Sequence, residues 1–121
     1  MSRAFRFTVA EDDSGFLALM QYLLSRAFPA SSFATFSNAA DALCHIQHSG
    51  TDILITDHGM GTMTGTELIQ KIRQDHNQLP IIMLSGDEQA EREALSAGAN
   101  EFLHKDVYKQ LVEHVKRYLP L

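Results

Sequence analysis

The chain has 121 residues, of which 45% are hydrophobic and 21% charged, and its formal net charge at pH 7 is −5. A chain of this length and composition fits one soluble globular domain. Its acidic balance argues against direct nucleic-acid binding, which favours a basic surface. No stretch approaches the roughly 18 apolar residues of a membrane span, and the first residues lack the apolar run of a signal peptide. These observations predict a cytoplasmic protein, or a domain of a longer one, that does not contact membranes.

Short apolar runs alternate with helical patterns along the whole chain. The helical patterns place apolar residues three or four positions apart, as in the run from Phe16 to Ala27. Asp13 or Ser14 is an expected helix N-cap, and Gly50 an expected helix end. In chain order we predict a strand over 4–10, a helix over 16–27, a strand over 33–36, a helix over 39–49, a strand over 52–57, a helix over 65–72, a strand over 81–84, a helix over 88–97, a strand over 101–103 and a helix over 108–119.

The runs over 52–57 and 81–84 have apolar centres, which is typical of strands buried on both faces of a parallel sheet. Alternating strands and helices predict an α/β fold with helices on both faces and right-handed crossovers. A five-stranded sheet of this kind commonly has the flavodoxin-like, doubly wound order 2-1-3-4-5. We therefore expect a single domain over residues 1–121, with no output domain in this chain.

The single cysteine, Cys44, excludes an intrachain disulfide and is compatible with a reducing cytosol. It falls within an apolar helical stretch, where a thiol behaves as a small hydrophobic residue. We therefore expect Cys44 to be buried and structural rather than reactive.

Polar side chains follow the predicted strands at the end where such sheets place their functional crevice. They are Glu11, Asp12 and Asp13 after the first strand, Asp57 at the end of the third, Ser85 after the fourth, and His104 and Lys105 after the fifth. The first and third strands are neighbours in the expected order. The side chains of Glu11, Asp12 and Asp57 should therefore converge.

Several carboxylates in one crevice repel each other, and a hard divalent cation relieves that repulsion. Mg²⁺ suits such oxygen ligands best, so we predict it as the cofactor. Lys105 adds positive charge and Ser85 a hydroxyl donor beside the Asp57 carboxylate. A nucleophilic carboxylate with a metal, a lysine and a hydroxyl is a set suited to phosphoryl transfer.

Over essentially its whole length the sequence resembles the receiver domain of response regulators in two-component signalling. Each matching segment is weak alone, but their order and spacing together are specific. The segments are residues 9–13, residues 52–57, Gly65, residues 80–86 and residues 98–105.

This resemblance implies roles at the phosphoryl group. Asp57 matches the phospho-accepting aspartate of the family. Ser85 and Lys105 match the groups that hold the phosphoryl oxygens. Phe102 matches the aromatic residue whose rotamer accompanies switching.

The resemblance also implies a set of Mg²⁺ ligands. Asp12 and Asp57 match the carboxylates that bind the ion, and Glu11 matches an acidic neighbour that acts through water. The backbone carbonyl of Gly59 matches the third protein ligand.

The sequence departs from the family pattern at two loops. Gly61 stands where a proline is common, which adds backbone freedom after the third strand. Asp106 follows Lys105 where a proline is also common, so the turn after the fifth strand is expected to differ. Asp106 is a candidate N-cap for the fifth helix.

Several of these residues also have ordinary structural explanations. Asp13 is expected to cap a helix rather than to bind metal, and a cap on the fourth helix is an alternative or additional role for Ser85. Phe102 is equally consistent with a core aromatic residue and with the switching role. His58 and His104 are expected to be exposed loop histidines, because two histidines without fixed spacing are a weak zinc signal.

The sequence thus predicts a phosphorylation-activated switch whose only chemistry is Mg²⁺-dependent self-phosphorylation and autodephosphorylation. A histidine kinase or histidine phosphotransfer protein would supply the phosphoryl group to Asp57. The face built from the fourth helix, fifth strand and fifth helix would then change shape. This face would act on a downstream protein, on an output domain outside this sequence, or on a second copy in a phosphorylation-dependent dimer.

Two other interpretations stay open. A receiver-like interaction module that is never phosphorylated in the cell is disfavoured by the complete set of acidic residues and lysine. A flavodoxin-like FMN protein is disfavoured because Glu11, Asp12 and Asp13 would repel the phosphate of FMN.

Overall fold

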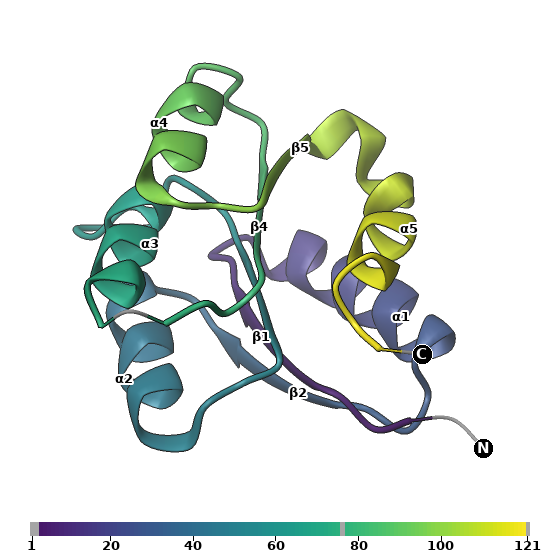
Figure 1. The fold of residues 1–121 in the computed structure, drawn as a ribbon. Coiled ribbons are helices and arrows are strands. Elements are labelled where there is room, and N and C mark those ends of the chain that lie inside the picture. Colours follow the sequence, from purple (N-terminus) through teal and green to yellow (C-terminus); the bar gives the residue numbers. More distant parts are fainter. Residues whose placement is uncertain (1–2, 76, 121) are drawn as a thin grey trace.

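The computed structural model describes residues 3–75 and 77–120, and no helix in this part of the chain is long and apolar enough to cross a membrane. The predicted alternation of strands and helices is confirmed along these residues (Figure 1). In chain order the elements are β1 (Arg6–Ala10), α1 (Ser14–Ala27), β2 (Ser32–Phe36), α2 (Ala39–Ser49), β3 (Ile53–Thr56), α3 (Gly65–Gln74), β4 (Ile81–Ser85), α4 (Ala90–Ala97), β5 (Glu101–His104), the 3-10 helix η1 (Lys105–Gln110) and α5 (Leu111–Lys116).

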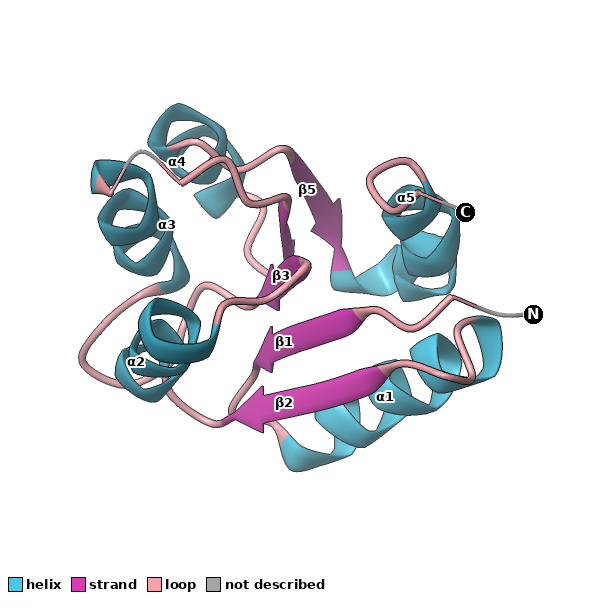
Figure 2. Ribbon diagram, turned by 60° about the horizontal axis from the view of Figure 1, so that its bottom comes forward, coloured by secondary structure: helices cyan, strands magenta, loops and turns pink. Residues whose placement is uncertain are grey.

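The strands form one parallel sheet in the order β2-β1-β3-β4-β5, which confirms the predicted doubly wound topology. Every residue of β3 and β4 is buried, as the apolar runs indicated. Helices α1 and α5 cover one face of the sheet, and α2, α3 and α4 cover the other (Figures 1 and 2). The carboxyl ends of all strands therefore meet at one edge.

Two apolar cores lie on the two faces, because successive side chains of a strand point to opposite sides. Ile53 and Ile55 of β3 pack with residues of α1 and α5, whereas Leu54 packs with residues of α2 and α3. Burying one such side chain contributes roughly 1.5–3 kcal/mol. The strand that leads to Asp57 is thus fixed from both faces.

The helix ends largely follow the expected signals. Asp13 Oδ1 accepts hydrogen bonds from the backbone N–H of Gly15 (3.0 Å) and Phe16 (3.1 Å), which confirms Asp13 as the N-cap of α1. Asn38 caps α2 through the N–H of Asp41. Gly50 ends α2, as predicted. Its N–H donates to Ile46 O, and its φ is positive at 71°.

The prediction that Cys44 is buried is wrong, because this residue is exposed. Helix α2 buries Ala39, Ala42 and Ile46, which recur at three and seven positions on one face. Cys44 is out of phase with these residues and lies on the solvent side of the helix. The helical period of the buried residues predicts the exposure of Cys44, whereas the apolar character of the neighbouring sequence does not.

Helix α4 begins at Ala90 rather than at the predicted Glu88. The preceding residues form a turn in which Ser85 Oγ accepts from the N–H of Asp87 (3.1 Å) and Asp87 Oδ1 accepts from that of Gln89 (3.0 Å). These local side-chain bonds compete with the helix for backbone donors and delay its start.

The start of α3 lies directly against the end of β3. The N–H of Gly65 donates to His58 O (2.7 Å). A Cβ atom at Gly65 would lie 1.9 Å from the carbonyl oxygen of Asp57, so only glycine allows this approach. The contact ties the loop of residues 58–64 to Asp57, which directly follows β3.

Candidate functional site

Three carboxylates gather where β1 and β3 end. Oxygen atoms of Glu11, Asp12 and Asp57 all lie within 4.8 Å of one another. The backbone causes this convergence, because Ala10 pairs with Thr56 in the parallel register and the N–H of Asp57 donates to Ala10 O (2.9 Å). The predicted acidic cluster is therefore present.

Lys105 reaches this cluster from the end of β5. Its Nζ atom lies 2.7 Å from Glu11 Oε1 and 3.0 Å from Asp57 Oδ2. The side chain of Glu11 is fully buried, that of Asp57 is 11% exposed, and Asp12 is exposed. The pocket holds three carboxyl groups and one lysine, so acidic groups outnumber basic ones beside solvent.

The donors of this pocket fit Mg²⁺. All three clustered side chains offer oxygen atoms, which hard divalent cations prefer. Asp12 and Gly59 are exposed, which leaves room for the water molecules that Mg²⁺ tends to keep. The electrostatics point the same way, because a divalent cation would offset the charge that Lys105 leaves uncompensated.

Burial and the hydrogen bonds and charges in the pocket shift two pKa values. Burial raises the pKa of Glu11 to about 7 from its ordinary value of 4.5, against the lowering effect of the hydrogen bond with Lys105. The nearby charge of Asp57 raises it further. For Lys105, burial lowers the pKa, but the hydrogen bonds with Glu11 and Asp57 outweigh it and the net direction is upward. The lysine therefore stays charged at neutral pH.

The raised pKa of Glu11 predicts a pH-dependent stability for the metal-free protein. Between pH 4.5 and about 7 the folded state holds a proton on Glu11 that the unfolded state has lost, so stability falls as the pH rises through this window. The loss amounts to about 3 kcal/mol. Glu11→Gln should remove it, so urea unfolding in a chelator at pH 5 and pH 8 should differ less in the variant than in the wild type. Parallel pH profiles of the two proteins would contradict the assignment.

Ser85 ends β4 at the same edge of the sheet as Asp57, and it is buried. Its Oγ atom accepts from the N–H of Asp87, so its hydroxyl hydrogen is free to be donated elsewhere. Phe102 is half-buried on β5 and packs against the core beneath α4. This position is consistent both with a core aromatic residue and with the switching role.

The histidines near the pocket are less exposed than expected. The N–H of His58 donates to Asp57 Oδ1 (2.7 Å), and the half-buried imidazole contacts Thr66 Oγ1 through Nδ1 (3.2 Å). His104 is also half-buried, and it caps η1 by accepting from the N–H of Asp106 (3.1 Å). The suggestion that Asp106 caps the fifth helix is therefore wrong.

Sequence reasoning missed one neighbour of the lysine. Lys105 Nζ lies 4.6 Å from the centroid of the Phe16 ring, and this ring meets Tyr108 edge-on at 5.9 Å. Such cation–π contacts contribute about 0.5–2 kcal/mol. Phe16 was assigned only to the core face of α1, and no motif in the sequence links it to Lys105.

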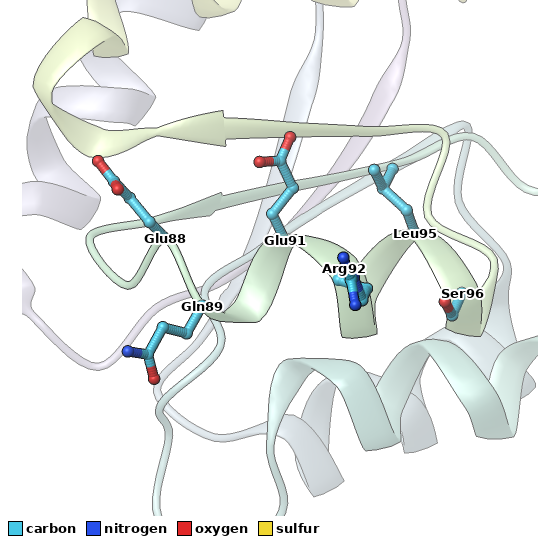
Figure 3. Close-up of a pocket in the computed structure, with 6 residues that line it drawn as sticks. All are labelled: Glu88, Gln89, Glu91, Arg92, Leu95 and Ser96. Carbon is cyan, nitrogen blue, oxygen red and sulfur yellow. The ribbon is translucent and has the colours of Figure 1, made fainter.

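A separate hollow lies along α4 and is lined by Glu88, Gln89, Glu91, Arg92, Leu95 and Ser96 (Figure 3). Glu91 and Leu95 project from the same side of the helix. Leu95 is 44% exposed. Glu88 and Gln89 of this hollow belong to the turn that follows Ser85.

A doubly wound sheet with a lysine-bridged acidic pocket at its carboxyl edge defines the class of this protein. Residues 7–116 match the response regulator receiver domain family. The chain therefore belongs to this family, and the resemblance seen in the sequence is confirmed. The chain is therefore a component of two-component, phosphorelay signalling.

Individual relatives agree with this assignment. ARR21 of Arabidopsis thaliana, named as a two-component response regulator, is 32% identical over 100 residues, which are 83% of this chain and 16% of that protein. The transcriptional regulatory protein KdpE of Staphylococcus aureus is 32% identical over 102 residues, 83% of this chain and 43% of KdpE. A solved structure named as a response regulator of Chloroflexus aurantiacus has a TM-score of 0.87 at 27% identity, covering 96% of this chain and 98% of that one. This chain thus spans less than half the length of these two curated relatives.

Proposed function

We propose that this chain is a phosphorylation-dependent switch that accepts a phosphoryl group on Asp57. The observation that carries the proposal is the position of Lys105 Nζ, which pairs with both Glu11 and Asp57 in a pocket that has an excess of carboxylates. Such a cluster is costly, because unpaired charge removed from water costs several kcal/mol. A role in binding an ion and a charged phosphoryl group accounts for that cost.

In the proposed reaction an oxygen of Asp57 attacks the phosphorus of a phosphohistidine on a partner protein. The new P–O bond forms as the P–N bond breaks, and the released imidazole takes a proton from water. Lys105 already faces the carboxylate and would offset charge on the phosphoryl oxygens. Ser85 would donate a hydrogen bond to one of them from the end of β4.

The proposed Mg²⁺ site uses the carboxylates of Asp12 and Asp57 and the backbone carbonyl of Gly59. Glu11 would act through water, because its buried carboxylate is already paired with Lys105. When bound, Mg²⁺ would supply charge stabilisation to the transferring phosphoryl group. Its binding would also favour the ionised form of Glu11, so a proton should be released near neutral pH.

The response to phosphorylation would pass through the turn after β4. Aspartyl phosphate adds charge and strong acceptor oxygens, and a shift of Ser85 toward them would move the residues that lead into α4. The α4 hollow with Glu91 and Leu95 would change with it, and Phe102 would adjust in the core beneath α4. This face is proposed to contact a downstream protein, an output domain, or a second copy of the chain.

Residues 1–121 are proposed to act as one receiver unit, phosphorylated by a histidine kinase or a histidine phosphotransfer protein. Transfer to the domain's own Asp57 makes it a switch rather than an enzyme for a separate substrate. A receiver-like module that binds partners without phosphorylation is the competing proposal.

Binding of beryllofluoride, which mimics a phosphoryl group, separates these two proposals. We expect the wild type to bind it in a Mg²⁺-dependent manner, measured by fluorine NMR or calorimetry. Lys105→Ala should weaken this binding by about tenfold or more, because a charge-assisted contact is lost. Lys109→Ala, at an exposed position on η1, is the matched control and should bind as the wild type does. Failure of the wild type to bind would favour the unphosphorylated module.

A further inference from the structure

The imidazole of His104 connects two loops at the carboxyl edge of the sheet. Its Nε2 atom lies 3.2 Å from the carbonyl oxygen of Gly86, which follows Ser85 at the end of β4. Its Nδ1 atom accepts from the N–H of Asp106, which follows Lys105. Ser85 and His104 are also direct partners in the β4–β5 register. One side chain thus contacts the neighbours of both residues proposed to hold phosphoryl oxygens.

The two contacts require one tautomer of the ring. A carbonyl oxygen can only accept, so Nε2 must carry the hydrogen, and Nδ1 then has the lone pair that receives the N–H of Asp106. Both ring nitrogens are satisfied, and the side chain is only 26% exposed. The orientation of the ring is therefore fixed from two sides.

The contact with Asp106 depends on a departure from the family pattern. A proline at position 106 has no N–H and could not donate to His104. In this chain the turn after β5 is held by a hydrogen bond to His104 instead of by a proline ring. The same histidine, through its other nitrogen, is then available to hold the turn after β4.

We propose that His104 is a positioning residue that fixes the separation of the Ser85 turn and the Lys105 turn, so that the two groups reach the same phosphoryl group. The proposal rests on the proposed function of Asp57. In this proposal the hydrogen bond from His104 Nε2 to Gly86 O contributes to phosphoryl binding. This role is additional to the capping of η1 by Nδ1. Lys105 already reaches Glu11 and Asp57, so the loss of this bond would chiefly misplace Ser85.

Two conservative variants separate the bond to Gly86 from the bond to Asp106. Asparagine places an oxygen where Nδ1 of histidine lies, so His104→Asn keeps an acceptor for Asp106 and removes the cross-loop donor. Glutamine places an amide nitrogen where Nε2 lies, so His104→Gln keeps the cross-loop donor and removes the acceptor. His104→Ala removes both, and His48→Asn, at an exposed histidine of α2, is the matched control.

The measurements are the limiting rate of labelling by acetyl phosphate, the affinity for beryllofluoride with Mg²⁺, and the affinity for Mg²⁺ alone. We expect His104→Asn and His104→Ala to lower the first two by about tenfold, as commonly happens when a group that orients a binding residue is lost. His104→Gln should retain most of both. Affinity for Mg²⁺ alone should stay within about twofold in all variants, because His104 contacts none of the proposed ligands.

Other outcomes would overturn the proposal. Labelling of His104→Ala at the wild-type rate would show that the hydrogen bond between His104 and Gly86 has no role. A defect in His104→Gln with normal His104→Asn would assign the effect to the η1 cap. A parallel loss of Mg²⁺ affinity and of urea resistance would assign it to general folding. If the wild type itself is not labelled, the proposed function of Asp57 fails, which is distinct from every result of the variants.

Discussion

Asp57→Asn is expected to abolish labelling by acetyl phosphate under conditions in which the wild type is phosphorylated. The amide has nearly the same shape as the carboxylate, but its oxygen is a far weaker nucleophile and it carries no charge for Lys105 to pair with. The contact of the side-chain oxygen with the N–H of His58 can persist, so the fold should be retained. Intact-protein mass spectrometry after incubation with the donor and Mg²⁺ measures the result directly.

The control for this experiment lies at the other end of the same strand. Asp52 precedes β3, is paired with Arg6, and stands at the amino edge of the sheet, away from the pocket. Asp52→Asn should be labelled as the wild type is. Retained labelling of Asp57→Asn at the normal rate would remove Asp57 as the acceptor, and labelling lost equally in both variants would point to a folding defect.

The topology was predictable because it depends on features that are local in sequence. The apolar runs of β3 and β4 indicated buried parallel strands, and the charged residues after each run marked their carboxyl ends. Once the strand order was assumed, Glu11, Asp12 and Asp57 had to meet, since β1 and β3 are neighbours in a fixed register. The acidic site followed from topology and residue type alone.

The details that could not be predicted depend on contacts between distant segments. The cation–π contact of Lys105 with Phe16 joins the start of α1 to the end of β5, and no spacing rule reports it. The bond of His104 to Gly86 likewise requires knowledge of the β4–β5 register. The absence of proline at residue 106 was visible in the sequence, but the histidine that compensates for it was not identifiable there.

Cys44 and the start of α4 show a different kind of error. The helical period of α2, applied strictly, would have placed Cys44 on the solvent side. Helix α4 starts later than predicted, because Ser85 and Asp87 bind the backbone donors of this segment locally. Competition between side chains and helix for the same N–H groups is difficult to decide from sequence.

Gly65→Ala is expected to destabilise the protein strongly and to disrupt the phosphoryl pocket. The added methyl carbon would lie 1.9 Å from Asp57 O and 3.0 Å from the terminal methyl of Met83. The first of these atoms belongs to the backbone at the end of β3, where both apolar cores hold the strand, so it cannot simply move aside. We expect a loss of about 3–4 kcal/mol in the free energy of unfolding, at the upper end of overpacking effects.

Gly65→Ala should lower both the stability of the fold and the affinity of the pocket for beryllofluoride. Relief of the overlap requires the start of α3 to retreat, and this breaks the bond from Gly65 N to His58 O, next to Asp57. Affinity for beryllofluoride should therefore fall in whatever fraction remains folded. Gly59→Ala is the matched control in the same loop, because a Cβ there would meet no atom within 4 Å, and its urea midpoint should stay close to that of the wild type. Equal midpoints for the two variants would mean that α3 and β3 are not in close contact in solution, and the tie between this helix and the phospho-acceptor would have to be abandoned.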